Sequence, residues 1–116
     1  MITVYGISNC DTVKKARAWL EARGIAYRFH DYRKDGLDPA LLEAWVDELG
    51  HDALVNRRGT TWRGLADADK ADLSRERAIA LMLKHPALIK RPLFDVGDSR
   101  RVGFDATVQE ALAAPA

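Results

Sequence analysis

Residues 2–32 read ITVYGISNCDTVKKARAWLEARGIAYRFHDY, and they contain two apolar runs separated by a helical pattern. The run from Ile2 to Tyr5 is β-branched and aromatic, ends at Gly6 and is typical of a buried strand. The run from Ile25 to Tyr32 alternates apolar and polar residues, which predicts a second strand.

The residues between these runs, Cys10 to Arg23, have a helical pattern. Apolar side chains recur at spacings of three and four, namely Val13, Ala16, Trp19 and Leu20. Gly24 is placed to end the helix with a left-handed residue. A helical crossover of about 14 residues between the two strands predicts a right-handed βαβ unit with parallel strands.

The next segment, about residues 36–90, is expected to be a helical insertion. Asp38 followed by Pro39 is a typical helix start, and Ser74 is a second N-cap. The predicted pieces are a helix from Asp38 to Gly50, a turn at 52–54, a polar loop at 56–61, a short helix around 66–71 and a helix from Ser74 that ends before Pro86.

The C-terminal part predicts a hairpin and a last helix. Two β runs, 93–96 and 101–104, flank the turn-forming residues 97–99, and Asp105 caps a helix over 107–113. We expect residues 114–116 to fray. The order βαβ, helices, ββα predicts one α/β domain over residues 1–116, with a mixed four-stranded sheet covered by helices on both faces.

Composition excludes several classes of protein. A chain of 116 residues can bury a core without metal or disulfides, and its net charge of +1 gives no global attraction to nucleic acid or an anionic membrane. The single cysteine cannot form an internal disulfide, and three scattered histidines do not complete a zinc site. We expect a cytoplasmic protein with no metal, because the sequence has no leader-like or membrane-spanning run and its lone cysteine suits a reducing compartment.

Cys10 is the candidate for chemistry because of its position at a helix start. Unpaired N–H groups and the positive end of the helix dipole favour a thiolate there, and Lys14 follows one turn later on the same face. The alternative is that Cys10 is a small buried apolar residue and Lys14 a solvated surface charge. The position three residues after Cys10, where a resolving cysteine would stand, holds Val13, so a mixed disulfide must be resolved by another thiol.

Two basic clusters offer anion binding. Arg57 and Arg58 lie in a loop with Gly and Thr, and Arg91 lies between Lys90 and Pro92. The guanidinium fork suits carboxylate, phosphate or arsenate, although arginines of this kind are also often only solubilising. The bond before Pro92 is expected to be trans on general grounds.

Three motifs together resemble the arsenate reductase (ArsC), Spx and YffB family, and the YffB-like branch in particular. They are residues 5–16 (YGISNCDTVKKA), 56–63 (NRRGTTWR) and 85–92 (HPALIKRP). The resemblance implies a thioredoxin-like fold with a helical insertion, and it implies that Pro92 is a cis proline facing the active cysteine.

The resemblance also implies functional residues. Cys10 matches the nucleophile, and Arg58 and Arg91 match two of the arginines that hold the oxyanion. A third family arginine is absent where this chain reads Val102-Gly103-Phe104, which leaves open whether Arg100 or Arg101 replaces it. We expect substrate or glutathione to contact Asn9, Lys14, Arg58, Arg91 and Pro92.

The function expected from this resemblance is a glutathione-dependent thiol reductase, with Cys10 as nucleophile and an external thiol as resolver. The alternatives are an arsenate reductase that uses glutathione or glutaredoxin, and a Spx-like regulator that binds RNA polymerase without catalysis. The expected partners are glutathione and either glutaredoxin or a protein disulfide. We expect a monomer with glutathione as cosubstrate, no tightly bound cofactor, and no nucleic acid or membrane partner.

Overall fold

The computed structural model describes residues 1–114. The chain divides into two compact units, and each is described by itself. Unit 1 contains residues 1–35 and the chain from residue 91 onward, and unit 2 is residues 36–90, the same bounds as the predicted insertion. The prediction that residues 114–116 fray lies, for 115–116, outside the described residues.

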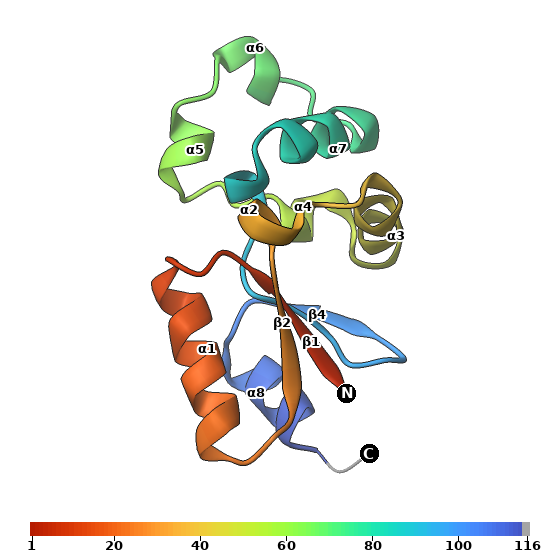
Figure 1. Cartoon of the computed structure of the whole chain (residues 1–116). Helices are drawn as coiled ribbons and strands as arrows, with labels where there is room; N and C mark the ends of the chain where they lie inside the picture. Colours follow the sequence, from red (N-terminus) through yellow and green to blue (C-terminus); the bar gives the residue numbers. More distant parts are fainter. Residues whose placement is uncertain (115–116) are drawn as a thin grey trace. The chain divides into compact units, whose positions relative to one another are not determined.

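Unit 1 contains a four-stranded mixed sheet and three helices (Figure 1). Its elements are β1 (Ile2–Gly6), α1 (Asp11–Ala22), β2 (Tyr27–Asp31), α2 (Tyr32–Asp35), β3 (Leu93–Asp95), β4 (Arg100–Val102) and α8 (Ala106–Ala113). The strand order is β2-β1-β3-β4, with β1 parallel to β2 and antiparallel to β3, and with β3 antiparallel to β4. The predicted βαβ unit, hairpin and mixed sheet are therefore confirmed.

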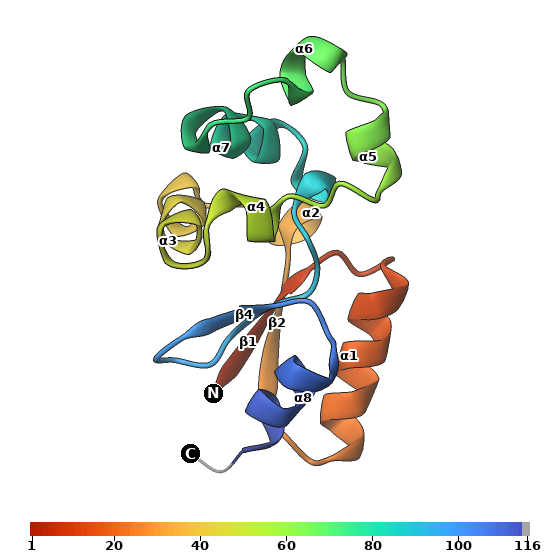
Figure 2. The same cartoon turned by 180° about the vertical axis from the view of Figure 1, so that it is seen from behind.

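One face of the sheet carries the hydrophobic core of unit 1. Its buried members are Val4, Ala16, Leu20, Phe94, Val108 and Leu112. Because these come from β1, α1, β3 and α8, both long helices of the unit pack on the same face, as Figure 2 shows. Phe104, which precedes α8, adds to this core by packing edge-on against Trp19 of α1 at a centroid separation of 5.6 Å.

All four strands differ from their predicted bounds by one or two residues at one or both ends, and the structure shows the cause for the ends of β4 and β2. β4 covers Arg100–Val102 and not 101–104, because Gly103 turns the chain with φ +87° and Phe104 leaves the sheet to join the core. β2 ends at Asp31, because the Asp31 carboxylate accepts a hydrogen bond from the Arg33 amide at 2.8 Å and so begins the short helix α2.

Unit 2 is helical, as predicted. Its elements are α3 (Pro39–Leu49), α4 (His51–Leu54), α5 (Thr60–Arg63), α6 (Asp67–Lys70), α7 (Arg75–Lys84) and the 3₁₀ helix η1 (Pro86–Leu88). The side chains of Asp38 and Ser74 cap α3 and α7 by accepting from the amides of Ala40 and Arg77. The predicted loop at 56–61 is shorter than expected, because α5 begins at Thr60.

The start and end of unit 2's second half are tied by backbone pairing. Val55 and Ile89 form an isolated antiparallel bridge, the Asn56 amide donates to Leu88 O at 2.8 Å, and the Lys90 amide donates to Leu54 O at 2.7 Å. This pairing fixes the chain just before the loop that carries Arg57 and Arg58 and just after η1. No helix within residues 1–114 has the length and apolar character needed to cross a membrane.

The contact between β1 and α1 depends on a glycine. A Cβ at Gly6 would lie 2.8 Å from Cγ2 of Val13, which is fully buried. A β-branched side chain has little rotamer freedom in a helix, so Val13 cannot move aside without disturbing the helix. Gly6 therefore allows the start of α1 to lie close to the end of β1.

We expect Gly6→Ala to destabilise the protein by about 1–3 kcal/mol through overpacking, as measured by urea unfolding. In a Val13→Ala background the added methyl group has room, so the cost of Gly6→Ala should fall well below its value in the wild type. An equal cost in both backgrounds would contradict the close packing of these two residues.

Candidate functional site

Cys10 occupies the N-cap position of α1, immediately after the turn that leaves β1. Its φ and ψ are −92° and 125°, and its amide closes the turn by donating to Ile7 O at 3.2 Å. The carbonyl of Cys10 accepts the first helical bond, from the Lys14 amide at 3.0 Å. The thiol is partly exposed and free. The helix begins one residue later than predicted, so Cys10 faces the first turn from outside it.

The surroundings of Cys10 favour its thiolate. Partial burial of the sulfur raises its pKa, but the backbone N–H groups of Val13 and Thr12 and the Arg91 guanidinium all lower it. The groups that stabilise the thiolate outweigh burial, and the pKa of Cys10 lies below its ordinary value. Backbone N–H donors and a cation act in the same direction because both interact more strongly with S⁻ than with SH.

Arg91 reaches Cys10 because of the sheet register. Leu93, the first residue of β3, pairs with Tyr5 of β1, so the residues just before β3 lie beside the loop that follows β1. The Arg91 guanidinium is one of the groups that lower the pKa of the Cys10 thiol, and the Arg91–Pro92 peptide bond is cis, as the family resemblance implied and contrary to the general expectation. Unit 1 thus brings together Cys10, Arg91 and Pro92.

The pattern analysis did not identify Asp31 as part of the site. Its carboxylate is 3% exposed and accepts a hydrogen bond from the Ser8 amide at 3.1 Å, two residues before Cys10. Burial raises the pKa of this carboxyl, but hydrogen bonds from the Arg33, Ser8 and Lys34 amides and the Ser8 hydroxyl outweigh burial, and the pKa lies below its usual value. A signal existed in the sequence, since an acidic residue ends an otherwise apolar strand.

Asn9 and Lys14 are both exposed. Asn9 lies in the turn between Ser8 and Cys10, and Lys14 lies in the first turns of α1. The cation that lowers the Cys10 pKa is Arg91. A role for Asn9 and Lys14 in contacting a substrate stays a prediction.

Arg58 belongs to unit 2, where it borders a shallow basic hollow of about 300 Å³. The hollow is lined by Asp52, Ala53, Val55, Asn56, Arg57, Arg58 and Lys90. Arg57 is paired with Asp52 at 2.8 Å and lies over the Trp62 ring at 5.4 Å. The Arg58 side chain, by contrast, makes no hydrogen bond or ion pair within residues 1–114, while its amide donates to Asn56 Oδ1 at 3.1 Å. Its guanidinium is available to an anion.

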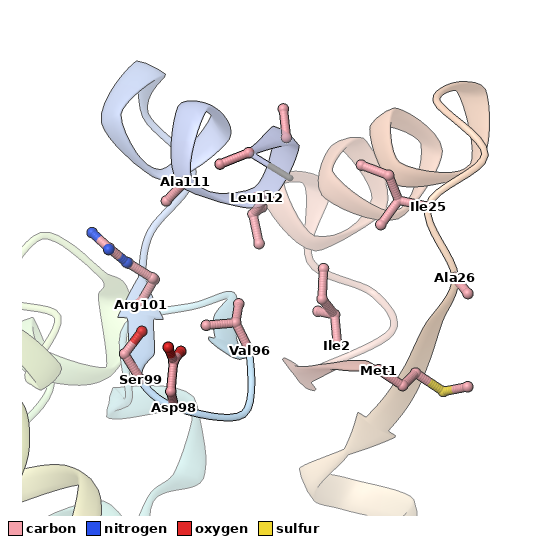
Figure 3. Close-up of a pocket in the computed structure, with 12 residues that line it drawn as sticks. Met1, Ile2, Ile25, Ala26, Val96, Asp98, Ser99, Arg101, Ala111 and Leu112 are labelled. Carbon is pink, nitrogen blue, oxygen red and sulfur yellow. The ribbon is translucent and has the colours of Figure 1, made fainter. Parts of the chain in front are cut away.

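Neither Arg100 nor Arg101 is directed toward Cys10. Arg100 lies beside the hairpin turn, with Nη1 3.7 Å from Asp95 Oδ1 and 3.4 Å from Gly97 O. Arg101 lines a hollow of about 840 Å³ at the other end of the sheet, together with Met1 and Ile2 at the start of β1 (Figure 3). Unit 1 therefore supplies one arginine, Arg91, to the thiol.

A family model matches most of the chain, including the residues of the site. The ArsC family model matches residues 5–112, which include Cys10, Arg58 and Arg91. The chain belongs to the ArsC family.

Relatives within the ArsC family are similar over nearly the whole chain. A solved YffB structure is 46% identical, covers 98% of this chain and 100% of its own, and superposes with a TM-score of 0.92. A solved structure of an arsenate reductase (ArsC) related protein from Brucella melitensis is 44% identical, covers 95% of this chain and 92% of its own, and gives a TM-score of 0.80. The thioredoxin-like fold of this ArsC-family chain and its likeness to YffB are thereby confirmed.

A regulator also belongs among the relatives of this ArsC-family protein. The global transcriptional regulator Spx of Streptococcus mutans is 28% identical over 107 residues, which are 90% of this chain and 77% of the regulator. A Haemophilus influenzae protein of uncharacterized function is 45% identical over 96% of this chain and 97% of its own length. The family therefore holds both arsenate reductase-related proteins and regulators.

We expect Arg91→Gln to raise the midpoint of Cys10 alkylation by iodoacetamide, measured against pH, by about one unit. The sign follows because Arg91 favours the charged thiolate, so removing its charge favours the neutral thiol. Arg101→Gln is the matched control, because it removes a cation from the same unit at the far end of the sheet and should leave the midpoint in place. Equal midpoints for wild type and Arg91→Gln would contradict the contact between Arg91 and the thiol.

Proposed function

We propose that this ArsC-family protein is a glutathione-dependent thiol reductase with Cys10 as its nucleophile. The observation that carries the proposal is the environment of Cys10, where two backbone N–H groups and Arg91 favour the thiolate at a partly exposed position. A thiolate is the form that attacks disulfide sulfur, so this environment supports thiol chemistry near neutral pH.

The proposed reaction has two exchange steps. The Cys10 thiolate attacks the glutathione sulfur of a mixed disulfide, an S–S bond forms between Cys10 and glutathione, and the substrate leaves as a thiolate that takes up a proton. A second glutathione, as its thiolate, then attacks the glutathione sulfur of that new disulfide. Oxidised glutathione leaves and Cys10 returns as a thiolate. In the net reaction the mixed disulfide is reduced to the substrate thiol, and its glutathionyl group and one free glutathione become one molecule of oxidised glutathione.

The need for glutathione follows from the cysteine content. Cys10 is the single cysteine of the 116 residues, and the next turn of α1 presents Val13, which is fully buried. Since the chain has no second thiol, the enzyme-bound disulfide must be opened by a thiol from solution. Glutathione carries two carboxylates, and the guanidinium groups of Arg91 and Arg58 are suited to bind carboxylates.

Arsenate reduction is the second candidate, and the Brucella melitensis relative favours it. Arsenate carries more than one negative charge, which calls for several cations around the nucleophile. The orientations of Arg100 and Arg101 argue against this candidate, because both lie away from Cys10 within unit 1. We therefore place disulfide reduction first.

Turnover of a glutathionylated peptide by the purified protein with excess glutathione tests the proposal. We expect Cys10→Ser to reduce the rate to that of glutathione alone, because a hydroxyl at this site is not ionised and cannot replace the thiolate. A matched assay with arsenate and glutathione, with and without glutaredoxin, separates the two reductases. Copurification with RNA polymerase, together with no turnover of either substrate, would replace both by a Spx-like regulatory role.

A pair of neighbouring arginines gives a sharper test of anion binding. We expect Arg58→Ala to raise the KM for glutathione about tenfold, which corresponds to one lost charge-assisted hydrogen bond. Arg57→Ala removes the same charge one residue earlier, but Arg57 is already paired with Asp52, so its KM should change much less. Steady-state kinetics on both variants checks this, and equal effects would mean that Arg58 contributes only general positive charge.

A further inference from the structure

We propose that Asp31 is a positioning residue for the nucleophile, because its buried carboxylate holds the Ser8 amide and thereby keeps Cys10 at the N-cap of α1. The proposal rests on the proposed role of Cys10, and it adds a residue that makes no contact with the reacting sulfur. It concerns the loop Ile7–Cys10, which connects β1 to α1.

Both oxygens of the Asp31 carboxylate accept hydrogen bonds from backbone amides. Oδ2 accepts from the Ser8 amide at 3.1 Å, and Oδ1 accepts from the Arg33 amide at 2.8 Å. The amide of Asp31 itself donates to Asp35 Oδ2 at 3.0 Å. Within residues 1–114, Asp31 is the buried charged residue, at 3% exposure. A buried carboxylate that loses a donor carries a desolvation cost, so each of these hydrogen bonds is strongly favoured.

The position of Asp31 in the sheet explains its reach. Asp31 pairs with Gly6, the last residue of β1, so its carboxylate lies beside the chain as it leaves the sheet. The chain then turns once, and the turn closes when the Cys10 amide donates to Ile7 O at 3.2 Å. Ser8 is the residue of this turn that is tied to β2. The hydrogen bond between Asp31 and Ser8 therefore fixes the position of Cys10 relative to the N–H groups of Thr12 and Val13.

A positioning role and a purely electrostatic role for Asp31 predict opposite changes in the pKa of Cys10. The groups that lower the pKa of Cys10 are Arg91 and the amides of Thr12 and Val13. Those that lower the pKa of Asp31 are the amides of Ser8, Arg33 and Lys34 and the Ser8 hydroxyl. A negative charge near a thiolate by itself raises the thiol pKa, so neutralising Asp31 through a purely electrostatic role would lower it. Loss of the loop position would raise the thiol pKa, because the sulfur would then lie farther from the amides of Thr12 and Val13, which lower it.

Asp31→Asn is the decisive variant. Asn is as good an N-cap as Asp, so its Oδ1 can still accept from Arg33 and keep α2, while its Nδ2 donor then faces the Ser8 N–H. We expect the pH midpoint of Cys10 alkylation by iodoacetamide to rise by about 0.5–1 unit. An unchanged or lowered midpoint in the folded variant would overturn the proposal.

Asp105→Asn is the matched control. Asp105 caps α8 in the same unit by accepting from the Val108 amide at 2.9 Å, so the substitution removes the same charge from the same kind of cap. We expect its alkylation midpoint to equal that of the wild type, and urea unfolding of both variants compares their stability. An equal upward shift in Asp105→Asn would show that the exchange of Asp for Asn at any cap of this unit disturbs Cys10, which would overturn a specific role for Asp31.

A measurement on the unaltered protein covers the case in which Asp31→Asn does not fold. Hydrogen exchange by NMR should show the Ser8 amide protected to a degree comparable with the Arg33 amide, since both donate to the same carboxylate. Exchange of the Ser8 amide at the rate of an open loop would overturn the proposal. Neither alkylation nor amide exchange uses glutathione, so a failure of the proposed reductase activity leaves these outcomes readable.

Discussion

The first turn of an α-helix has backbone N–H groups with no carbonyl to accept them, and in this protein the sulfur of Cys10 faces two of them. The same geometry that completes α1 thus lowers the pKa of the thiol. Burial of the sulfur acts in the opposite direction, and Arg91 joins the N–H groups in overcoming it. The chemistry of the site follows from this balance.

Several features of unit 1 hold Cys10 close to the groups that lower its pKa. Gly6 lets the start of α1 lie close to β1, because a Cβ there would meet Val13. The pairing of Tyr5 with Leu93 brings Arg91 beside the loop, and the Asp31 carboxylate ties Ser8 to the end of β2. These contacts come from three strands, which explains why a short loop can hold Cys10 in one place.

The two units contribute different chemistry. Unit 1 holds Cys10, Arg91 and the cis Pro92, whereas unit 2 presents Arg58 beside a hollow that is also lined by Arg57 and Lys90. Arg57 is neutralised by Asp52, so the two adjacent arginines differ in what they offer an anion. Membership of the ArsC family, which includes both arsenate reductase-related proteins and Spx regulators, is consistent with one scaffold carrying several roles.

Local patterns in the sequence were sufficient for most elements and for the placement of Cys10 at a helix start. The alternation in residues 25–32 predicted β2, which covers Tyr27–Asp31, and the predicted caps at Asp38, Ser74 and Asp105 are present. All of these features depend on neighbours within a few residues. Contacts between segments far apart in the chain were decided by packing. Phe104 packs against Trp19, 85 residues away, in the core that α1 and α8 share, and the Asp31 carboxylate accepts from the Ser8 amide across 23 residues. Neither contact has a local periodicity, because sheet register and core packing bring such residues together only when the whole unit has folded.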